Sequence, residues 1–224
     1  MKINKLILSI ICALSCSSVA MAEGLFGGGP FKGFYVGGQG GYGTSDAEAQ
    51  DVSGVIPFTG MTVDAGSDGW SYGVLGGWGT TLPSSSVYLG IEGQYNWLDR
   101  SGEFSVPFIG FAVDWETNDM WSVGGRLGYL LGGNTMAFVR GAYASMDVDI
   151  SVSGVGPFPL DVDTLTGYEL GFGVEHIVGQ NFTLRGEFVY SDYGNADVDL
   201  EGFGTITEID DTVTEGRISL SYSF

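Results

Sequence analysis

Eight segments of alternating polarity constrain this chain more than any other feature of its sequence. Apolar and polar side chains alternate along each segment, which is the pattern of a β-strand with two different faces. The segments span approximately residues 34–43, 70–80, 87–97, 121–131, 136–145, 167–177, 182–192 and 214–224. Each has about the ten residues that a tilted strand needs to cross a bilayer. The sequence therefore predicts an all-β chain of eight strands that can span a membrane.

The connections between these segments alternate between short and long. The short ones are Pro83–Ser86, Gly132–Thr135 and Gly179–Asn181. The long ones are residues 44–69, 98–120, 146–166 and 193–213. This alternation is typical of outer-membrane barrels, whose short turns face the periplasm. We therefore expect an eight-stranded antiparallel transmembrane up-and-down barrel with four long extracellular hairpin loops; a water-soluble barrel of the lipocalin type is the structural alternative.

The polarity of the two strand faces separates these alternatives. In the last segment, Ile218, Leu220, Tyr222 and Phe224 share one face, whereas Arg217 and the serines between them share the other. A soluble barrel hides its apolar face inside, and a membrane barrel turns it outward. Aromatic residues also gather near the segment ends, at the level of the aromatic girdles of membrane barrels. Both patterns favour the membrane barrel.

Charged residues on the polar faces predict the content of the barrel. They are Glu92, Arg126, Arg140, Glu169, Glu175, Arg185, Glu187 and Arg217. Four arginines and four glutamates can pair, and an isolated charge in a narrow interior would be very unfavourable. An eight-stranded barrel is just wide enough for side chains to fill it. We therefore expect a charge-balanced polar plug rather than an open pore.

The N-terminus predicts export. Lys2 and Lys5 precede the apolar stretch 6–14, and Ala20-Met21-Ala22 supplies small residues at the cleavage positions. We expect residues 1–22 to be a cleaved signal peptide and residues 23–224 to be one outer-membrane β-barrel domain. A lipoprotein signal at Cys16 is the alternative, although the residues before it form a poor lipobox.

The mature chain would be strongly acidic and free of cysteine. Cys12 and Cys16 lie in the signal peptide, so no disulfide is expected. Removal of residues 1–22 takes away two lysines and leaves 6 basic and 27 acidic residues, a formal charge of −21. This sign excludes nucleic acid as a partner. Of the 27 acids, 22 fall in the long connections and their flanks, where they either bind divalent cations or simply form a solvated surface.

The long connections resemble one another. Residues 52–58 (Val-Ser-Gly-Val-Ile-Pro-Phe) recur as 152–158 and more weakly as 104–108. Their arms alternate in polarity, with acids on one face of 147–152 and 197–201. We infer that the strands continue beyond the membrane as hairpins. Their tips would expose Phe58, Phe108 and Phe158 to a neighbouring surface, unless these rings pack locally.

No motif for catalysis, a cofactor or a metal fits its context. Residues 38–43 match G-x-G-x-x-G but lie in a strand with no helix after it. The single histidine, His176, stands beside Glu175, which points to the opposite face of the strand. No Asp-x-Asp-x-Asp-Gly calcium loop is present. We expect no catalytic residue, no cofactor and no metal.

Both ends of the barrel segment resemble a known family. Residues 31–38 and 217–224 resemble the first and last strands of the small outer-membrane β-barrels, which include opacity-type porins, Omp25/Omp31-like surface antigens and the OmpA-like barrel. Ile218, Leu220, Tyr222 and Phe224 look like the signal read by the barrel-assembly machinery. The resemblance implies outer-membrane lipids, lipopolysaccharide and this machinery as partners. No peptidoglycan-binding domain follows Phe224, so wall anchoring is not expected.

Three functions remain open at this point. The first is a non-enzymatic surface barrel that contributes to envelope structure and makes adhesive or antigenic contacts through its acidic loops. The second is a narrow, cation-preferring channel. The third is an outer-membrane hydrolase, for which the sequence offers no site. The sequence does not identify a surface or host ligand.

Overall fold

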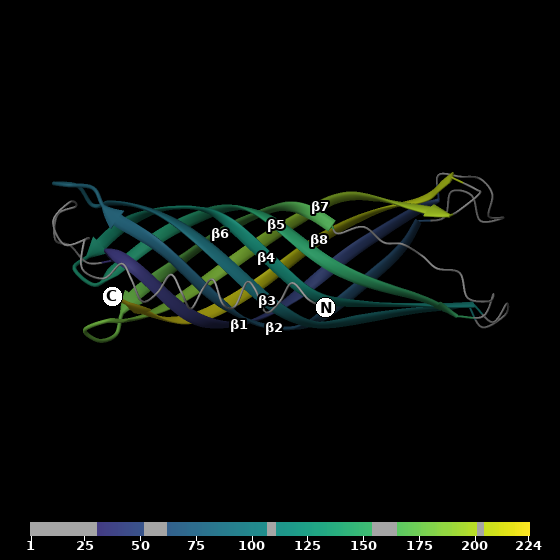
Figure 1. Ribbon diagram of the computed structural model, residues 1–224, viewed down its shortest axis with the longest axis horizontal. Coiled ribbons are helices and arrows are strands. Elements are labelled where there is room, and N and C mark those ends of the chain that lie inside the picture. Colours follow the sequence, from purple (N-terminus) through teal and green to yellow (C-terminus); the bar gives the residue numbers. More distant parts are fainter. Residues whose placement is uncertain (1–30, 52–61, 107–110, 154–164, 201–203) are drawn as a thin grey trace.

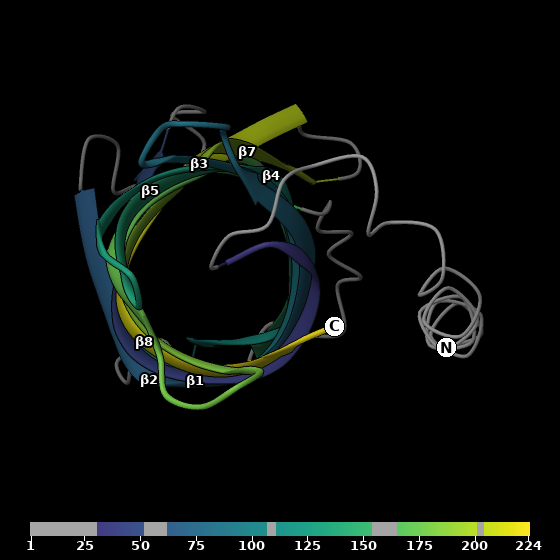
Figure 2. The same cartoon turned by 90° about the vertical axis from the view of Figure 1, so that its left-hand side faces the viewer.

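The strands close into a single barrel. The computed structural model describes residues 31–51, 62–106, 111–153, 165–200 and 204–224. Each strand pairs antiparallel with the next one along the chain, and the last pairs with the first. Viewed along the long axis, the strands form a complete ring (Figure 2). The predicted eight-stranded up-and-down barrel is therefore confirmed.

The strands are longer than a membrane crossing requires. They are β1 (Gly33–Asp51), β2 (Thr62–Thr81), β3 (Val87–Val106), β4 (Phe111–Gly132), β5 (Thr135–Ser153), β6 (Leu165–Ile177), β7 (Phe182–Leu200) and β8 (Gly204–Ser223). Seven have 19 to 22 residues and β6 has 13, against the roughly ten that a tilted strand needs. The barrel is accordingly elongated along its axis (Figure 1). Within the described ranges, no helix has the length and apolar character of a membrane span.

Much of each predicted long loop is paired strand. The β1–β2 ladder runs without interruption from Gly33 opposite Gly79 to Gln50 opposite Thr62. The inference that the strands continue as hairpins is confirmed over these residues, and the three short turns lie where they were predicted. The expected tips Phe58, Phe108 and Phe158, like the expected signal peptide, lie outside the described residues.

The outer face of the barrel is apolar between two belts of aromatic side chains. Its exposed aliphatic residues include Val36, Val74, Ile91, Val123, Leu127, Val139, Leu170, Val174, Leu184, Ile218 and Leu220. The belt nearer the hairpins contains Tyr42, Trp70, Tyr72, Trp97, Trp121, Tyr143, Tyr168 and Tyr190, and the belt nearer the short turns contains Phe34, Tyr129, Phe182, Tyr222 and Phe224. A soluble barrel would bury the aliphatic set, so the lipocalin-type alternative is wrong.

Beyond the hairpin-end belt, the polarity of the wall inverts. Outward positions there carry aspartates: Asp46, Asp68, Asp99, Asp119, Asp147 and Asp192. Inward positions carry apolar residues, among them Leu98, Met120 and Val213. Three tyrosines at this level donate hydrogen bonds to aspartates on the adjacent strand: Tyr42 of the belt to Asp68, the half-buried Tyr95 to Asp119 (2.8 Å), and Tyr168 of the belt to Asp192 (2.9 Å). This inversion marks where the wall leaves lipid and enters water.

A lysine on the apolar band is expected to destabilise the barrel. Ile218 is 66% exposed between the two belts, so Ile218→Lys would place a charge in hydrocarbon and lower the free energy of unfolding by about 2–4 kcal/mol. The measurement is a urea titration of protein refolded in lipid vesicles. Thr166→Lys is the matched control, since Thr166 is exposed beyond the belt, and equal losses for both variants would contradict the assigned membrane band.

Candidate functional site

The barrel interior holds every charged residue that the sequence placed on the polar faces. The eight side chains come from β3 to β8, and each has a relative exposure of 7% or less. Strand alternation turns them inward, and glycines beside them leave the necessary room. A Cβ atom at Gly171 would collide with the Glu187 carboxylate, and one at Gly124 with the backbone of β5.

Four of these residues form a closed ring of ion pairs near the short turns. Arg185 contacts Glu92 (2.8 Å) and Glu175 (3.3 Å). Arg126 contacts the same two carboxylates, Glu92 at 3.4 Å and Glu175 in a closer contact. The Tyr35 hydroxyl donates a further hydrogen bond to Glu92 (2.6 Å). Two positive and two negative charges thus neutralise one another within this ring.

The other charged residues form an open chain nearer the hairpins. Arg140 lies between Glu187 (3.0 Å) and Glu169 (2.9 Å). Arg217 lies between Glu169 (2.9 Å) and Glu215 (3.0 Å). The chain contains three carboxylates and two guanidinium groups, so it carries one negative charge in excess.

Glu215 is a correction to the sequence prediction. It was counted among the acids of the outer extensions, but its side chain is 2% exposed inside the barrel, where it also accepts a hydrogen bond from Ser71. The described interior is therefore not charge-balanced, with five glutamates and four arginines. The signal was available, because Glu215 stands two residues before Arg217 and must share its face.

Amide side chains join the ring to the chain. Gln94 donates to Glu92 (2.9 Å) and accepts from Arg217 (3.0 Å). Gln39 donates to both Gln94 (3.0 Å) and Asn96 (2.6 Å). Gln94 and Asn96 were expected on the polar face of β3, but the predicted interior network contained only charged residues. Together with the ion pairs, they make one continuous polar layer across the barrel.

An apolar cluster, here called the turn-side cluster, covers this layer on the side of the short turns. It consists of Tyr88, Met136 and Phe138, with Phe31 and Leu130 packed against it. The guanidinium carbon of Arg126 lies 4.3 Å from the centre of the Phe138 ring, and that of Arg185 lies 5.3 Å from it. Such cation–π contacts are favourable in a desolvated site. The cluster therefore packs directly on the ion-pair ring.

A second apolar cluster, the hairpin-side cluster, lies at the opposite end of the interior. Its members are Leu98, Met120, Ala144, Met146, Leu165, Tyr193 and Val213, all at most 9% exposed. The Tyr193 hydroxyl contacts the Met120 sulfur at 2.7 Å. Neither cluster was predicted from the sequence, which indicated a polar interior throughout. The observed interior is instead layered, with a charged layer between two apolar ones.

His176 and the glycine motif at residues 38–43 form no catalytic or cofactor-binding site among the described residues. His176 is exposed near a short turn, and its Nδ1 atom lies 2.8 Å from the Thr135 hydroxyl oxygen. Residues 38–43 lie within β1, at the closing pair with β8. Within the part of the chain that the structure describes, no three His, Cys, Asp or Glu side chains gather as a metal site.

These features define a class of protein: a small membrane-spanning β-barrel with an apolar outer face and a charged interior. The sequence pattern of the family "Outer membrane protein beta-barrel domain" matches residues 8–224. The chain belongs to this family and is an outer-membrane protein, as the resemblance of its first and last strands indicated.

Its relatives include proteins that are named as outer-membrane proteins. The 31 kDa outer-membrane immunogenic protein of Brucella melitensis is 26% identical over 177 residues, covering 73% of this chain and 70% of that protein. The 25 kDa outer-membrane immunogenic protein of the same organism is 25% identical over 200 residues, covering 88% and 78%. The outer-membrane protein OprG of Pseudomonas aeruginosa superposes with a TM-score of 0.57 at 11% identity, covering 88% of this chain and 98% of OprG. That structural likeness shows a shared fold.

Removing one arginine from the ion-pair ring is expected to destabilise the barrel strongly. Arg185→Met leaves two buried carboxylates short of a partner, so the free energy of unfolding should fall by about 3–5 kcal/mol. Adding Glu92→Gln should restore part of this loss, because one uncompensated charge is then removed. Urea titration in vesicles measures both, with Arg185→Lys as the control that keeps the charge. Strictly additive losses in the double variant would show that the two residues do not act as one unit.

Proposed function

We propose that this protein is a non-enzymatic structural and surface-contact protein of the outer membrane, with an interior that does not conduct. One observation carries the proposal: the polar layer of the barrel lies between the turn-side and hairpin-side clusters. An ion would have to pass both apolar layers, and apolar constrictions exclude water and ions. The closed ion-pair ring between them is neutral, so it offers little to a passing ion.

The exterior supports a role in surface contact. The hairpins extend the barrel well beyond the belt, and Asp68, Asp99, Asp119 and Asp192 occupy the first outward positions on their strands there. The relatives from Brucella melitensis are named as outer-membrane immunogenic proteins. An extended acidic wall, rather than a chemical site, is what this protein would present to antibodies or to a host surface.

We further propose the route by which the chain reaches this position. Residues 1–22 would direct export and be removed. The outward row Ile218, Leu220, Tyr222 and Phe224 at the end of β8 would be read by the barrel-assembly machinery, and the apolar band would then be solvated by outer-membrane lipid and lipopolysaccharide. An aromatic terminal residue with apolar residues at alternate positions supports this assignment.

A narrow cation-preferring channel is the second candidate. The carboxylate in excess, Glu215, and the acidic outer wall favour it, because rings of acidic residues select cations. It requires that water cross both apolar clusters, which is why we place it second.

Planar-bilayer recording separates the two functions. The native barrel should show no conductance steps. A variant with Met120, Met146 and Tyr193 all changed to alanine should stay silent as well, since the polar layer and the turn-side cluster remain. Changing Arg126, Arg140, Arg185 and Arg217 to alanine should produce leakage, because five uncompensated carboxylates would draw water into the barrel. Discrete, cation-selective conductance steps from the native protein would contradict the proposed non-conducting interior and show that the protein is a channel.

Shortening the hairpins tests the surface role. Residues 46–66 can be replaced by Asn-Gly, which joins Ser45 to its ladder partner Ser67 through a tight hairpin turn; matching cuts shorten the other three. We expect the barrel to fold while intact cells lose most of their binding to serum raised against the native protein, together with attachment to epithelial monolayers. Heat-modifiable gel mobility confirms folding. Undiminished serum binding and attachment would mean that the hairpins are not the contact surface.

A further inference from the structure

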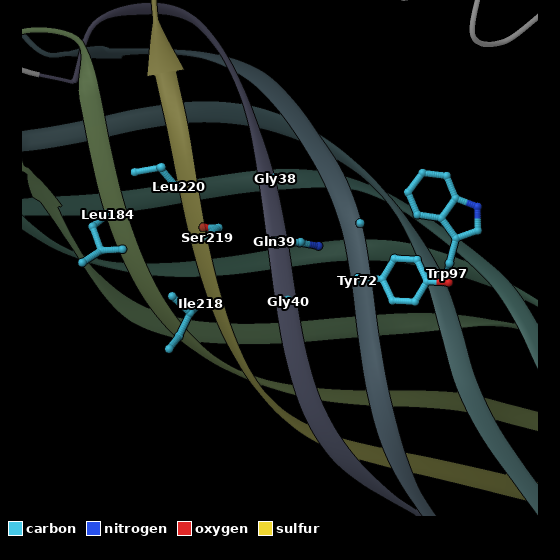
Figure 3. Close-up of a pocket in the computed structure, with 10 residues that line it drawn as sticks. Gly38, Gln39, Gly40, Tyr72, Trp97, Leu184, Ile218, Ser219 and Leu220 are labelled. Carbon is cyan, nitrogen blue, oxygen red and sulfur yellow. The ribbon is translucent and has the colours of Figure 1, made fainter.

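The lipid-facing wall is grooved where the barrel closes. The groove follows β1, between the strands β8 and β2 on its two sides, and has a volume of about 450 Å³. Gly38 and Gly40 form its floor (Figure 3). Tyr72 and Trp97 stand on one side, with ring centres 5.8 Å apart and nearly stacked, and Ile218 and Leu220 stand on the other. It is a separate feature from the interior and does not rest on the proposed function.

The floor glycines are not required by packing within the barrel. A Cβ atom added to Gly38 or Gly40 would lie 3.8 Å from a backbone oxygen of β2, an ordinary contact. The inward Gly73 on the adjacent strand differs, because a Cβ there would collide with Tyr95 and Asn96. Glycine also weakens a strand interior. Its presence at two successive outward positions therefore keeps the floor of the groove low at the expense of strand stability.

The groove lies inside the membrane band. Tyr42 and Trp70, in edge-to-face contact at 5.1 Å, stand beyond its hairpin end, and Phe34 belongs to the belt at its other end. Its exposed walls are aromatic and aliphatic, and Tyr72, Ile218 and Leu220 are 57%, 66% and 49% exposed. A molecule in the groove must therefore be apolar, long and available within the membrane.

We propose that this groove binds one acyl chain of an outer-membrane lipid, lying along β1 over Gly38 and Gly40. Bulk lipid is as apolar as the groove, so transfer from water does not favour binding. Dispersion contacts do favour binding. An acyl chain on the glycine floor between two walls makes such contacts on three sides, whereas a chain on a flat wall makes them on one side.

The dimensions favour a single chain over a second copy of the barrel. Tyr72 on β2 and Ile218 on β8 stand on strands that are second neighbours, so the backbones of these two strands lie about 9.5 Å apart. Packed sheets keep their backbones about 10 Å apart because side chains fill the space between them. The backbone of another barrel's wall would therefore stay about 10 Å from the glycines, and only its side chains could enter the groove.

Quenching of Trp97 by a brominated lipid tests this site. A variant retains Trp97 and has phenylalanine at Trp70, Trp78, Trp115 and Trp121; a second variant retains Trp121 instead, which is also in the hairpin-end belt but outside the groove. Phosphatidylethanolamine with brominated acyl chains is titrated into each refolded barrel in detergent micelles. We expect Trp97 quenching to saturate at a single lipid per barrel and Trp121 quenching to rise linearly with the lipid-to-detergent ratio.

Filling the floor provides the control. Gly40→Val in the Trp97 protein should raise the lipid concentration for half-maximal quenching several-fold, whereas Gly125→Val, at an outward glycine on β4 away from the groove, should leave it unchanged. Both variants should fold, since a Cβ fits at either position. Linear quenching of Trp97, or no effect of Gly40→Val, would overturn the proposal. So would sedimentation as a dimer that Gly40→Val dissociates, because the occupant would then be a second copy.

Discussion

The structure depends on closing the backbone hydrogen-bond ladder between β1 and β8. A bilayer offers no water to satisfy backbone groups, so a sheet in it has to close on itself. Closure at eight strands leaves an interior that only side chains fill. The inward and outward side chains of every strand then face different environments. The layered interior, the apolar band and the aromatic belts all follow from that separation.

The charges buried in the interior are compensated in two different ways. The ring of Glu92, Arg126, Glu175 and Arg185 is neutral and closed, so each charge faces two of opposite sign. The chain that ends at Glu215 is open and carries the excess negative charge. Arg126 and Arg140 even stand directly opposite each other on β4 and β5, an arrangement that is tolerable only because each has two carboxylates of its own.

The alternation of the sequence was enough to predict the strands, their number and the inward placement of eight charged residues, since each of these follows from local parity. Which arginine meets which glutamate was not predictable, because the pairs join strands as distant as β3 and β7. The hairpin-side cluster was missed for a related reason: Leu98, Met120, Met146, Leu165 and Val213 lie in segments interpreted as loops, where inward parity was not followed. Glu215 was missed for a different reason: it lies within the predicted strand 214–224, on the face of Arg217, but was counted with the acids of the adjoining long connection.

The inversion of wall polarity also sets the depth of the barrel in the bilayer. Phe34 and Tyr42 are eight residue steps apart on β1, which is about 26 Å along the strand and about 20 Å along the membrane normal at a tilt of about 40°. Aspartates beyond the hairpin-end belt prevent the barrel from sinking further. An ordinary hydrocarbon core is about 30 Å thick, so lipids beside this protein would have to shorten toward it. Hydrophobic mismatch thus gives the barrel a preference for thin membranes, and makes it a local thinning agent in thicker ones.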